Sequence, residues 1–420
     1  MTDKELYQPP SKAPRFYYGY IVVAAAFIIM VVSWGLYIVF GVFFNPLLDE
    51  FGWTRAMTSG AFSLSSILHG VLGIAMGGLT DRFGPRLVVT FCGIFLGVGY
   101  LLMSQVNAVW QLYLFYGVII GIGMSGLWVP LLSSVARWFT GKRSMMTGIV
   151  ICGLTIGQLV APPLISRLIA AYDWRLSYAI LGGVVIVIIV VAAQFLRRDP
   201  GQMVPSSGNE NEEAENRTKH DNKDYTFKEA VSTAQFWLLF AILFGFGYAA
   251  FSITVHLVPH AIELGIPDVS AANILAVNGG IGIIGNFVLG GIIGDRIGNR
   301  KVFIIGSILM VASLLWLVPA RELWVLYLFA VVFGLALGGM GTSESPLTAR
   351  LFGLSSHGLI YGVIGLGFTA GGAVGPVVTG YIFDRVESYQ LAFVVCAAFG
   401  IICLILSAIL RPTKKLGTKL

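Results

Sequence analysis

Apolar residues run along this chain in long stretches, and short polar or glycine-rich segments separate one stretch from the next. A helix needs roughly 20 apolar residues to cross about 30 Å of hydrocarbon, and the stretches have that length. Long strict alternation, which a transmembrane β-barrel needs, is absent from the sequence. We therefore predict an all-α membrane protein with twelve transmembrane helices. They cover residues 17–45, 54–80, 86–106, 108–137, 143–170, 175–197, 233–261, 269–294, 301–319, 322–350, 358–383 and 389–410.

One polar segment is much longer than the others and divides the chain. Residues 197–229 are rich in Asn, Glu, Lys, Ser and Asp and hold too few apolar residues to bury a core. We predict a mobile linker there, ending in a short surface helix around Tyr225, Phe227 and Ala230. The predicted organisation is an N-terminal tail (1–16), a first six-helix bundle (17–197), a linker (198–230), a second six-helix bundle (231–410) and a C-terminal tail (411–420).

The two halves repeat each other at a spacing of 214 residues. Both a charged turn and a glycine pattern recur at this spacing. The repeated positions include Asp81 and Asp295, Arg82 and Arg296, Arg86 and Arg300, Gly157 and Gly371, and Pro162 and Pro376. Internal repeats of this kind are common in transporters whose two bundles face each other across a central site. We predict two pseudo-symmetric bundles around a cavity that opens alternately to either side.

Composition agrees with a membrane location and removes other classes of function. The 420 residues are 56% hydrophobic and 11% charged, which is too apolar for a soluble domain. The net charge of +6 indicates no nucleic-acid partner, because the basic residues are spread among short loops. Most Lys and Arg lie on the side that holds both termini, which places that side in the cytoplasm. The exceptions are Arg55, Arg167, Arg175, Arg321 and Arg385.

The sequence offers no chemistry typical of enzymes. The four cysteines lie in apolar stretches without CxxC spacing, so we expect neither a disulfide nor a metal site. Glycine strings such as Gly121-Ile-Gly123 lack the strand and turn of a dinucleotide site. We therefore expect no enzyme and no cofactor.

The charged turn resembles the loop signature of the major facilitator superfamily. Its copies read Gly77-x-x-x-Asp81-Arg82-x-Gly84-x-Arg86 and Gly291-x-x-x-Asp295-Arg296-x-Gly298-x-Arg300. The resemblance implies the major facilitator fold and a conformational latch made by Asp81, Arg82, Arg86, Asp295, Arg296 and Arg300. In that family the aspartate lies against the N-terminus of a helix in the opposite half. Asp81 is then expected at the helix of 358–383, and Asp295 at the helix of 143–170.

Other residues resemble bacterial members of the monocarboxylate porter branch. They are Arg137-Trp138-Phe139-x-x-Lys142-Arg143, Tyr17-Tyr18-Gly19-Tyr20 and Phe51-Gly52-Trp53-Thr54-Arg55. This resemblance implies a bacterial inner membrane and a small organic acid as substrate. Transporters of the branch hold the substrate carboxylate with an arginine one turn after an Asp or Asn, and animal members carry a lysine in the first helix. Here these positions are Asn286, Gly282 and Ile38, so both usual cations are missing.

Ionisable groups inside hydrocarbon are costly, so each is a candidate site. His69 lies near the middle of its predicted helix and suits either a packed neutral imidazole or a proton carrier. Glu344 could bind the substrate or a proton. Alternatively, its carboxylate is capped by Ser343 or Ser345, or is paired with Arg350. His69 and Glu344 are the proton-coupling candidates.

Other polar and aromatic residues complete the candidate set. His256 and His260 share one helix face; a metal pair is one interpretation, although no third ligand accompanies them, and an outer-gate role for His256 is the other. Asn278, Gly282 and Asn286 form a stripe that either faces a substrate or bonds to a neighbouring helix. The predicted substrate-binding residues are Tyr37, His69, Trp128, His256, Asn278, Asn286, Glu344 and Tyr361.

Together these features predict a secondary transporter in which two bundles rock around one central site. The expected substrate is a small organic acid moved with protons. One alternative is a proton-driven exporter of neutral or cationic compounds, and another, of a different class, is a non-transporting membrane sensor. The expected partners are a small-molecule substrate, protons and the lipid bilayer, with the chain functional as a monomer.

Overall fold

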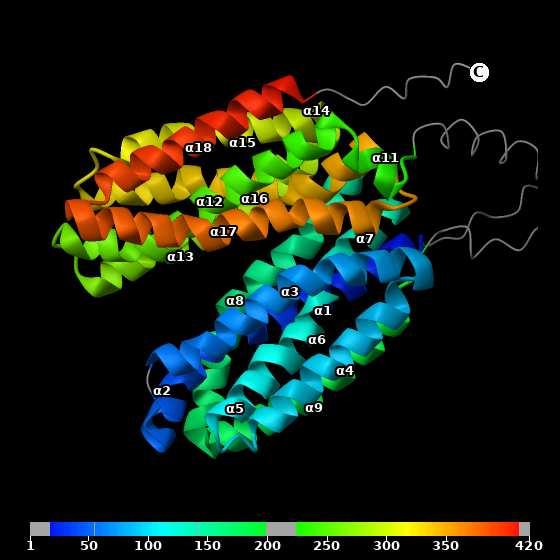
Figure 1. Cartoon of the computed structure of the whole chain (residues 1–420), viewed down its shortest axis with the longest axis vertical. Helices are drawn as coiled ribbons and strands as arrows, with labels where there is room; N and C mark the ends of the chain where they lie inside the picture. Colours follow the sequence, from blue (N-terminus) through cyan, green and yellow to red (C-terminus); the bar gives the residue numbers. More distant parts are fainter. Residues whose placement is uncertain (1–16, 54, 140, 199–223, 411–420) are drawn as a thin grey trace, which may run out of the picture.

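The computed structural model describes residues 17–53, 55–139, 141–198 and 224–410, which are mostly helical (Figure 1). The first half contains α1 (Gly19–Ile38), α2 (Phe40–Phe51), α3 (Arg55–Phe83), α4 (Pro85–Met103), α5 (Val109–Leu112), the π-helical η1 (Tyr113–Ile120), α6 (Gly121–Ser125), α7 (Val129–Trp138), α8 (Arg143–Tyr172) and α9 (Trp174–Gln194). The second half contains α11 (Phe227–Val231), α12 (Ala234–Glu263), α13 (Asp268–Ile284), the π-helical η3 (Gly285–Ile293), α14 (Gly294–Ile297), α15 (Asn299–Leu317), α16 (Leu323–Phe352), α17 (His357–Val386) and α18 (Gln390–Ile409). The predicted tails, and residues 199–223 of the predicted linker, lie outside the described residues.

Twelve helical stretches of the described chain are long and apolar enough to cross a membrane, which confirms the predicted fold class. The clearest local difference lies in the stretch Val109–Trp138, which the sequence predicts as one regular helix. There η1 widens the helical turn, and the chain leaves the helix between Gly126 and Trp128 before α7 begins. Pro130 stands in the first turn of α7, where a missing N–H costs no intrahelical hydrogen bond.

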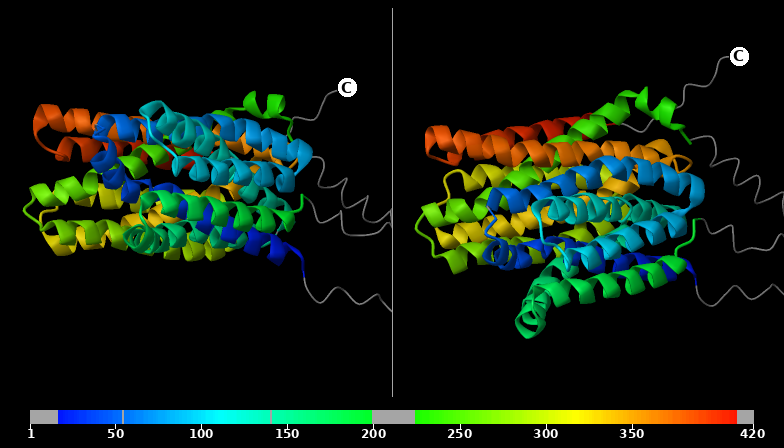
Figure 2. Two further views of the ribbon diagram at one scale, coloured as in Figure 1. Left: turned by 90° about the horizontal axis from the view of Figure 1, so that it is seen from below. Right: turned by 60° about the horizontal axis from the view of Figure 1, so that its bottom comes forward.

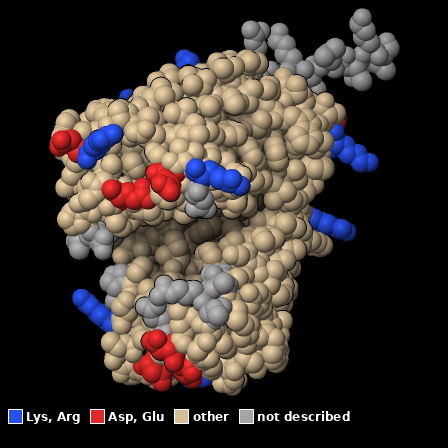
Figure 3. Space-filling view, turned by 60° about the vertical axis from the view of Figure 1, so that its left-hand side comes forward, with Lys and Arg blue, Asp and Glu red and all other residues tan. Residues whose placement is uncertain are grey.

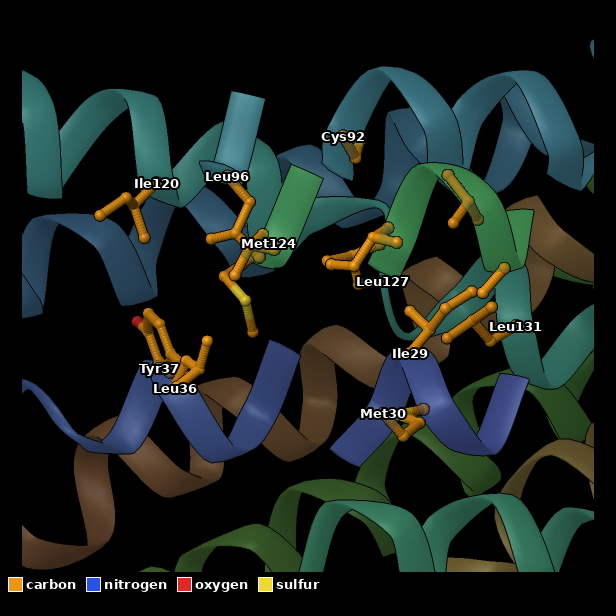
Figure 4. Close-up of a cluster of buried hydrophobic side chains, with 14 of the residues drawn as sticks. Ile29, Met30, Leu36, Tyr37, Cys92, Leu96, Ile120, Met124, Leu127 and Leu131 are labelled. Carbon is orange, nitrogen blue, oxygen red and sulfur yellow. The ribbon is translucent and has the colours of Figure 1, made fainter. Parts of the chain in front are cut away.

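The helices form two bundles, each with its own hydrophobic core. Figure 1 shows α1 to α9 on one side and α12 to α18 on the other, and in Figure 2 the long helices of both halves run in roughly the same direction. One core cluster joins buried side chains of the first bundle and includes Tyr361 of the second, and the other joins residues of the second bundle. In the first core, Leu36 and Tyr37 of α1 face Leu96 of α4 and Met124 of α6 (Figure 4). Each bundle therefore has a densely packed interior of its own.

The two ends of the molecule differ. The described chain starts and finishes at one end, which also holds the α3–α4, α7–α8, α14–α15 and α16–α17 connections and which we call the terminal end (Figure 1). We call the opposite end the open end. Seen from that side, a deep hollow separates the two bundles, and its visible walls are formed by residues other than Lys, Arg, Asp and Glu (Figure 3).

At the open end, an ion pair holds α2 to the first bundle. Glu50 Oε1 lies 2.6 Å from Arg175 Nη2, and Trp174 Nε1 donates to Glu50 Oε2 at 2.7 Å. The hydrogen bond from Arg175 lowers the pKa of the Glu50 carboxyl, so this carboxylate stays ionised to lower pH than a free glutamate. Arg175 also donates to the carbonyl oxygens of Ser104 and Val106. The starts of α9 and α5 and the end of α2 are thereby tied together.

The short helix predicted at the end of the linker is present as α11. Thr226 and Glu229 form a capping box at its N-terminus. Just before it, the Asp224 carboxylate accepts hydrogen bonds from the backbone N–H groups of Leu354 and Ser355, each at 3.1 Å. The chain that leads into α11 is therefore docked on the α16–α17 connection.

Glycines allow helix backbones within each bundle to touch. A Cβ atom on Gly157 of α8 would collide with the carbonyl oxygen of Val31 in α1. A Cβ atom on its repeat partner, Gly371 of α17, would collide with the carbonyl oxygen of Phe244 in α12. Close backbone packing of this kind is a main source of helix association in lipid. The repeated glycines therefore mark equivalent helix contacts in the two bundles.

The substitution Gly157→Ala is expected to destabilise the fold, because the added methyl group meets backbone rather than a movable side chain. Overpacking of this kind costs roughly 1–3 kcal/mol. Thermal unfolding of the purified protein in detergent should show a lower midpoint. Gly183→Ala is the matched control, since a Cβ at Gly183 meets nothing within 4 Å. An unchanged midpoint for Gly157→Ala would show that the α1–α8 contact does not depend on this glycine.

Candidate functional site

Aromatic and polar side chains of the first bundle meet near its boundary with the second. The ring of Trp34 in α1 lies 5.4 Å from the ring of His69 in α3 and 5.5 Å from that of Trp128, measured between centroids. Tyr37, three residues after Trp34, shares a hydrogen bond of 2.9 Å with Ser66 Oγ. Trp128 stands in the interruption before α7, with φ −120° and ψ −72°. The interruption thus frees Trp128 from the side-chain direction that a continuous helix would impose.

A chain of hydrogen bonds continues from Trp128 into the second bundle. Trp128 Nε1 donates to Tyr361 Oη at 3.1 Å, and that hydroxyl donates to Glu344 Oε2 at 3.3 Å. Tyr361 of α17 is 1% exposed and Glu344 of α16 is 5% exposed. Five predicted substrate residues therefore lie in one contiguous group, together with Trp34, which the sequence did not single out. We call Trp34, Tyr37, His69, Trp128, Glu344 and Tyr361 the junction cluster.

Glu344 does not have the local partners that its sequence neighbours suggest. Ser343 Oγ has no hydrogen-bond partner within the described chain, and Ser345 Oγ donates to the carbonyl oxygen of Leu132 at 3.5 Å. Arg350 is exposed, and the ion pairs found in the described ranges do not include it. A buried carboxyl group whose side-chain partner is a neutral hydroxyl is costly when ionised. A proton or a ligand could offset that cost.

The asparagines of the predicted stripe are turned toward α16 in this conformation. Asn278 Nδ2 donates to the carbonyl oxygen of Ala330 at 3.2 Å, and Thr342 Oγ1 donates to Asn286 Oδ1 at 3.1 Å. Both asparagine residues are buried, at 6% and 5% exposure. Here they hold neighbouring helices together, as the alternative interpretation of the stripe expects. Their contact with a substrate stays a prediction.

His256 and His260 lie near the open end, apart from the junction cluster. The His256 ring nitrogens contact Tyr389 Oη at 3.2 Å and the carbonyl oxygen of Pro376 at 2.9 Å. His260 packs edge-on against Tyr389 and Phe393 and borders a separate pocket of about 340 Å³. Among the described residues, no group of three or more His, Cys, Asp or Glu side chains is placed to hold a metal ion. An outer-gate role for His256 stays a prediction.

At the terminal end, Asp81 reaches from the first bundle to the N-terminus of α17. The backbone N–H groups of Gly358 and Leu359 donate to its two carboxylate oxygens at 3.1 and 3.0 Å. Such N–H groups have no carbonyl partner within their own helix, and the helix dipole favours a negative charge beside them. Arg137 Nη2 lies 2.6 Å from the same carboxylate, and the two side chains are only 8% and 12% exposed. One aspartate thus binds a helix terminus of the other bundle and a buried guanidinium of its own.

Asp295 makes the equivalent contact in the opposite direction. Its carboxylate accepts hydrogen bonds from the backbone N–H groups of Ser144 and Met145, at 2.8 and 3.0 Å, at the N-terminus of α8. Asn299 Nδ2 adds a bond of 2.7 Å to Ser144 Oγ. No basic side chain of the described residues forms an ion pair with Asp295. The two contacts are alike in hydrogen bonding and different in charge.

The glycines of the repeated turn have two structural roles. Gly77 lies so close to Gly358 of α17 that a Cβ on either residue would collide with the carbonyl oxygen of the other. This approach brings Asp81 within reach of the helix terminus. Gly84 and Gly298 have φ angles of +85° and +94°, which other L-residues rarely adopt. The turn therefore needs glycine both at the bundle contact and at the reversal of the chain.

The arginines of the repeated turns lie apart from the contacts between the bundles. Arg82 and Arg296 are exposed. Arg86 donates to a side chain of α9, and Arg300 donates to carbonyl groups of α18, each within its own bundle. The hydrogen bonds of Arg86 and Arg300 therefore do not join the two bundles. The part of the four arginines in the latch stays a prediction. Arg137, which the sequence did not assign to the latch, is the basic residue at Asp81.

Two six-helix bundles on either side of a hollow, with contacts across their boundary, have the architecture of a multi-pass membrane transporter. The chain belongs to the Major Facilitator Superfamily, whose family model matches residues 25–294 and 283–419. It is therefore a secondary transporter of small molecules and not an enzyme. The resemblance to the superfamily inferred from the repeated turn is confirmed.

Similar proteins of known name agree with this assignment. The chain is 23% identical to Monocarboxylate transporter 12 of Mus musculus, over 99% of this chain and 89% of the relative. It is 24% identical to the Oxalate:formate antiporter of Oxalobacter formigenes, over 94% and 93%. Among solved structures, a variant of the Escherichia coli fucose:proton symporter FucP superposes with a TM-score of 0.72 at 16% identity, over 95% of this chain and 100% of that one. The human organic anion transporter MFSD10 reaches 0.70 at 14% identity, over 95% and 100%. The structural likeness shows the fold alone.

The substitution Asp81→Asn should weaken the terminal-end contact, because it removes the negative charge that faces the N–H groups of α17 and leaves the Arg137 guanidinium unpaired beside that positive helix end. Loss of one partner of a buried pair costs roughly 3 kcal/mol or more. A cysteine introduced at Ser345, which is fully buried beside Leu132 of the other bundle, should then react faster with a thiol reagent. Asp295→Asn should have a smaller effect. The matched control is Asp173→Asn at the open end, and a reaction rate equal to that of the native background in Asp81→Asn would contradict the latch.

Proposed function

We propose that this protein moves a small organic acid across the membrane together with a proton. The observation that carries the proposal is the hydrogen-bonded chain Trp128–Tyr361–Glu344, which crosses from one bundle to the other beside His69. Glu344 is the acid in this chain, and no ion pair to it is found among the described residues. A carboxyl group in such a place suits a proton carrier, since protonation removes the charge that burial makes costly.

The names of the relatives support the class of substrate. Several of them are monocarboxylate transporters, and another is an oxalate:formate antiporter. The fucose:proton symporter FucP, which shares the fold, is named as a transporter that moves its substrate together with protons. Proton coupling for this chain rests on Glu344 and His69, and the organic acid rests on the relatives.

We place the terminal end in the cytoplasm of a bacterium and the open end on the outside. The excess of Lys and Arg on the connections of the terminal end supports this orientation. The structure then corresponds to an outward-facing state, in which the hollow of Figure 3 admits substrate from outside. The Asp81 and Asp295 contacts close the cytoplasmic side in this state and break when the bundles rock into the other. A single chain suffices for this cycle.

A transport cycle follows from the placement of the junction cluster. In the outward-facing state, Glu344 takes up a proton and the substrate enters between the bundles. Rocking of the bundles carries both inward, because the cluster draws residues from each of them. Opening of the terminal end then exposes Glu344 to the cytoplasm, where the proton leaves. An ionised Glu344 repels an anion, so binding of the acid and of the proton favour each other.

A second candidate function is supported by the lack of positive charge on the visible walls of the hollow. The visible walls of the hollow carry no basic side chain, and Asn286 stands where an anion-binding arginine is expected. A Glu344 without an ion-pair partner would suit a neutral or cationic compound, exported in exchange for protons. Binding of a hydrophobic cation that disappears in Glu344→Gln, without binding of organic acids, would favour this candidate.

Proteoliposomes with an acidic outside should accumulate L-lactate, formate or oxalate faster than proteoliposomes without a pH gradient. Glu344→Gln keeps a similar shape and removes the titrating group, so its uptake should no longer respond to the gradient. Glu322→Gln, an exposed residue just before the same helix, is the matched control and should behave like the native protein. An uptake rate of the native protein that is the same with and without the pH gradient would contradict proton coupling.

A further inference from the structure

Trp34 carries a hydrogen-bond donor that the fold leaves unused. Its indole Nε1 is buried without a hydrogen-bond partner among the described residues. By contrast, the indole of Trp128, packed against it, donates to Tyr361. The indole N–H can only donate. At this depth in a membrane protein an unpaired N–H is costly, so a donor kept at the centre of the molecule calls for an acceptor.

His69 stands beside Trp34 and is likewise free to bind. Its ring contacts are with Trp34 and Tyr37, and no hydrogen bond to it is found among the described residues. It is only partly buried. A neutral imidazole has one N–H donor and one acceptor nitrogen. Trp34 and His69 therefore present two N–H donors at adjacent positions of α1 and α3.

We propose that Trp34 and His69 form the subsite for the substrate's carboxylate group. This inference rests on the proposed function, since it assigns a position to the organic acid. A carboxylate has two oxygen atoms, each of which can accept one of the two N–H bonds. Hydrogen bonds to a charged acceptor are about twice as strong as those between neutral groups. The subsite takes the place of the cation that the resemblance leads us to expect at Asn286 in the second bundle.

The surroundings of the subsite explain why it lies in the first bundle. Asn286, at the position of the expected arginine, already accepts a hydrogen bond from Thr342 and packs on α16. Ile38, at the position of the expected lysine, is apolar. Arg137, in the first bundle, is paired with Asp81 at the terminal end. Neutral donors therefore remain to hold the anion.

The place of the subsite also separates the anion from the proton. The Trp128–Tyr361 pair lies between Trp34 and Glu344, so the carboxylate and the carrier acid approach from opposite bundles. In this conformation the Trp34 N–H is covered by its neighbours. Occupation of the subsite therefore requires the side chains around the indole to move, after which His69 holds the second carboxylate oxygen. Trp34 thereby acts as a specificity-determining residue for acids.

The test is a binding titration of purified protein with L-lactate, formate and oxalate, and with lactamide as the neutral analogue. Trp34→Phe keeps the aromatic ring and removes only the donor. We expect its affinity for the acid that binds native protein to fall about tenfold, which corresponds to ~1.4 kcal/mol. Lactamide should lose less. Trp316→Phe on α15, whose side chain is exposed, is the matched control and should bind as the native protein does.

The results distinguish the subsite from the proposed function. If the native protein neither binds nor transports any of the three acids, the proposed function fails and the subsite fails with it. If the acids bind and Trp34→Phe matches the native protein, the subsite is overturned while the proposed function stands. His69 gives a second, independent variant pair should Trp34→Phe not fold. His69→Gln, which retains a donor, should keep most of the affinity that His69→Leu loses, and native affinity in both would overturn the subsite.

Discussion

A carboxylate at the N-terminus of a helix in the opposite bundle is the interaction on which this conformation depends. Asp81 binds α17 and Asp295 binds α8, each through two backbone N–H groups. The N–H groups concerned have no carbonyl partner within their own helices. They gain a hydrogen-bond acceptor only when the two bundles meet at this end. On the Asp81 side, Arg137 of the same bundle adds a buried ion pair to the carboxylate. Because both contacts lie at one end, the hollow opens at the other.

The junction cluster connects this closed end with the chemistry of transport. Glu344 sits on α16 and Tyr361 on α17, the helix whose N-terminus Asp81 holds. Movement of α17 away from Asp81 would therefore also move Tyr361 relative to Trp128. In this way one helix joins the latch to the hydrogen-bonded chain that crosses between the bundles. A proton on Glu344 and a substrate beside Trp128 would each bias the same two-state element, which is the requirement for coupled transport.

The fold was predictable because apolar length and a repeat of 214 positions are properties of the sequence itself. The contacts of Asp81 and Asp295 followed from resemblance, and Glu344 and His69 from the cost of burying ionisable groups. Trp34 was missed because an aromatic residue in an apolar stretch is usually packing, and what sets it apart is an unpaired indole N–H beside His69 and Trp128. The direction of Asn278 and Asn286 was open because it depends on which neighbour α13 and η3 pack against, namely α16. Arg137 could be recognised as a latch residue only from the structure, because its contact with Asp81 depends on how the ends of α3 and α7 pack together.

We propose that the two bundles move as rigid bodies, so that one end of the molecule opens as the other closes. This motion is tested most directly by pulsed electron paramagnetic resonance distances between spin labels on exposed residues of the two bundles. One label pair belongs at Tyr172 and Val386 of the open end, and another at Phe83 and Ile297 of the terminal end. We expect that, when Asp81→Asn shifts the protein from the present state, the first distance shortens while the second lengthens. Distances that stay fixed, or that change in the same direction at both ends, would contradict it.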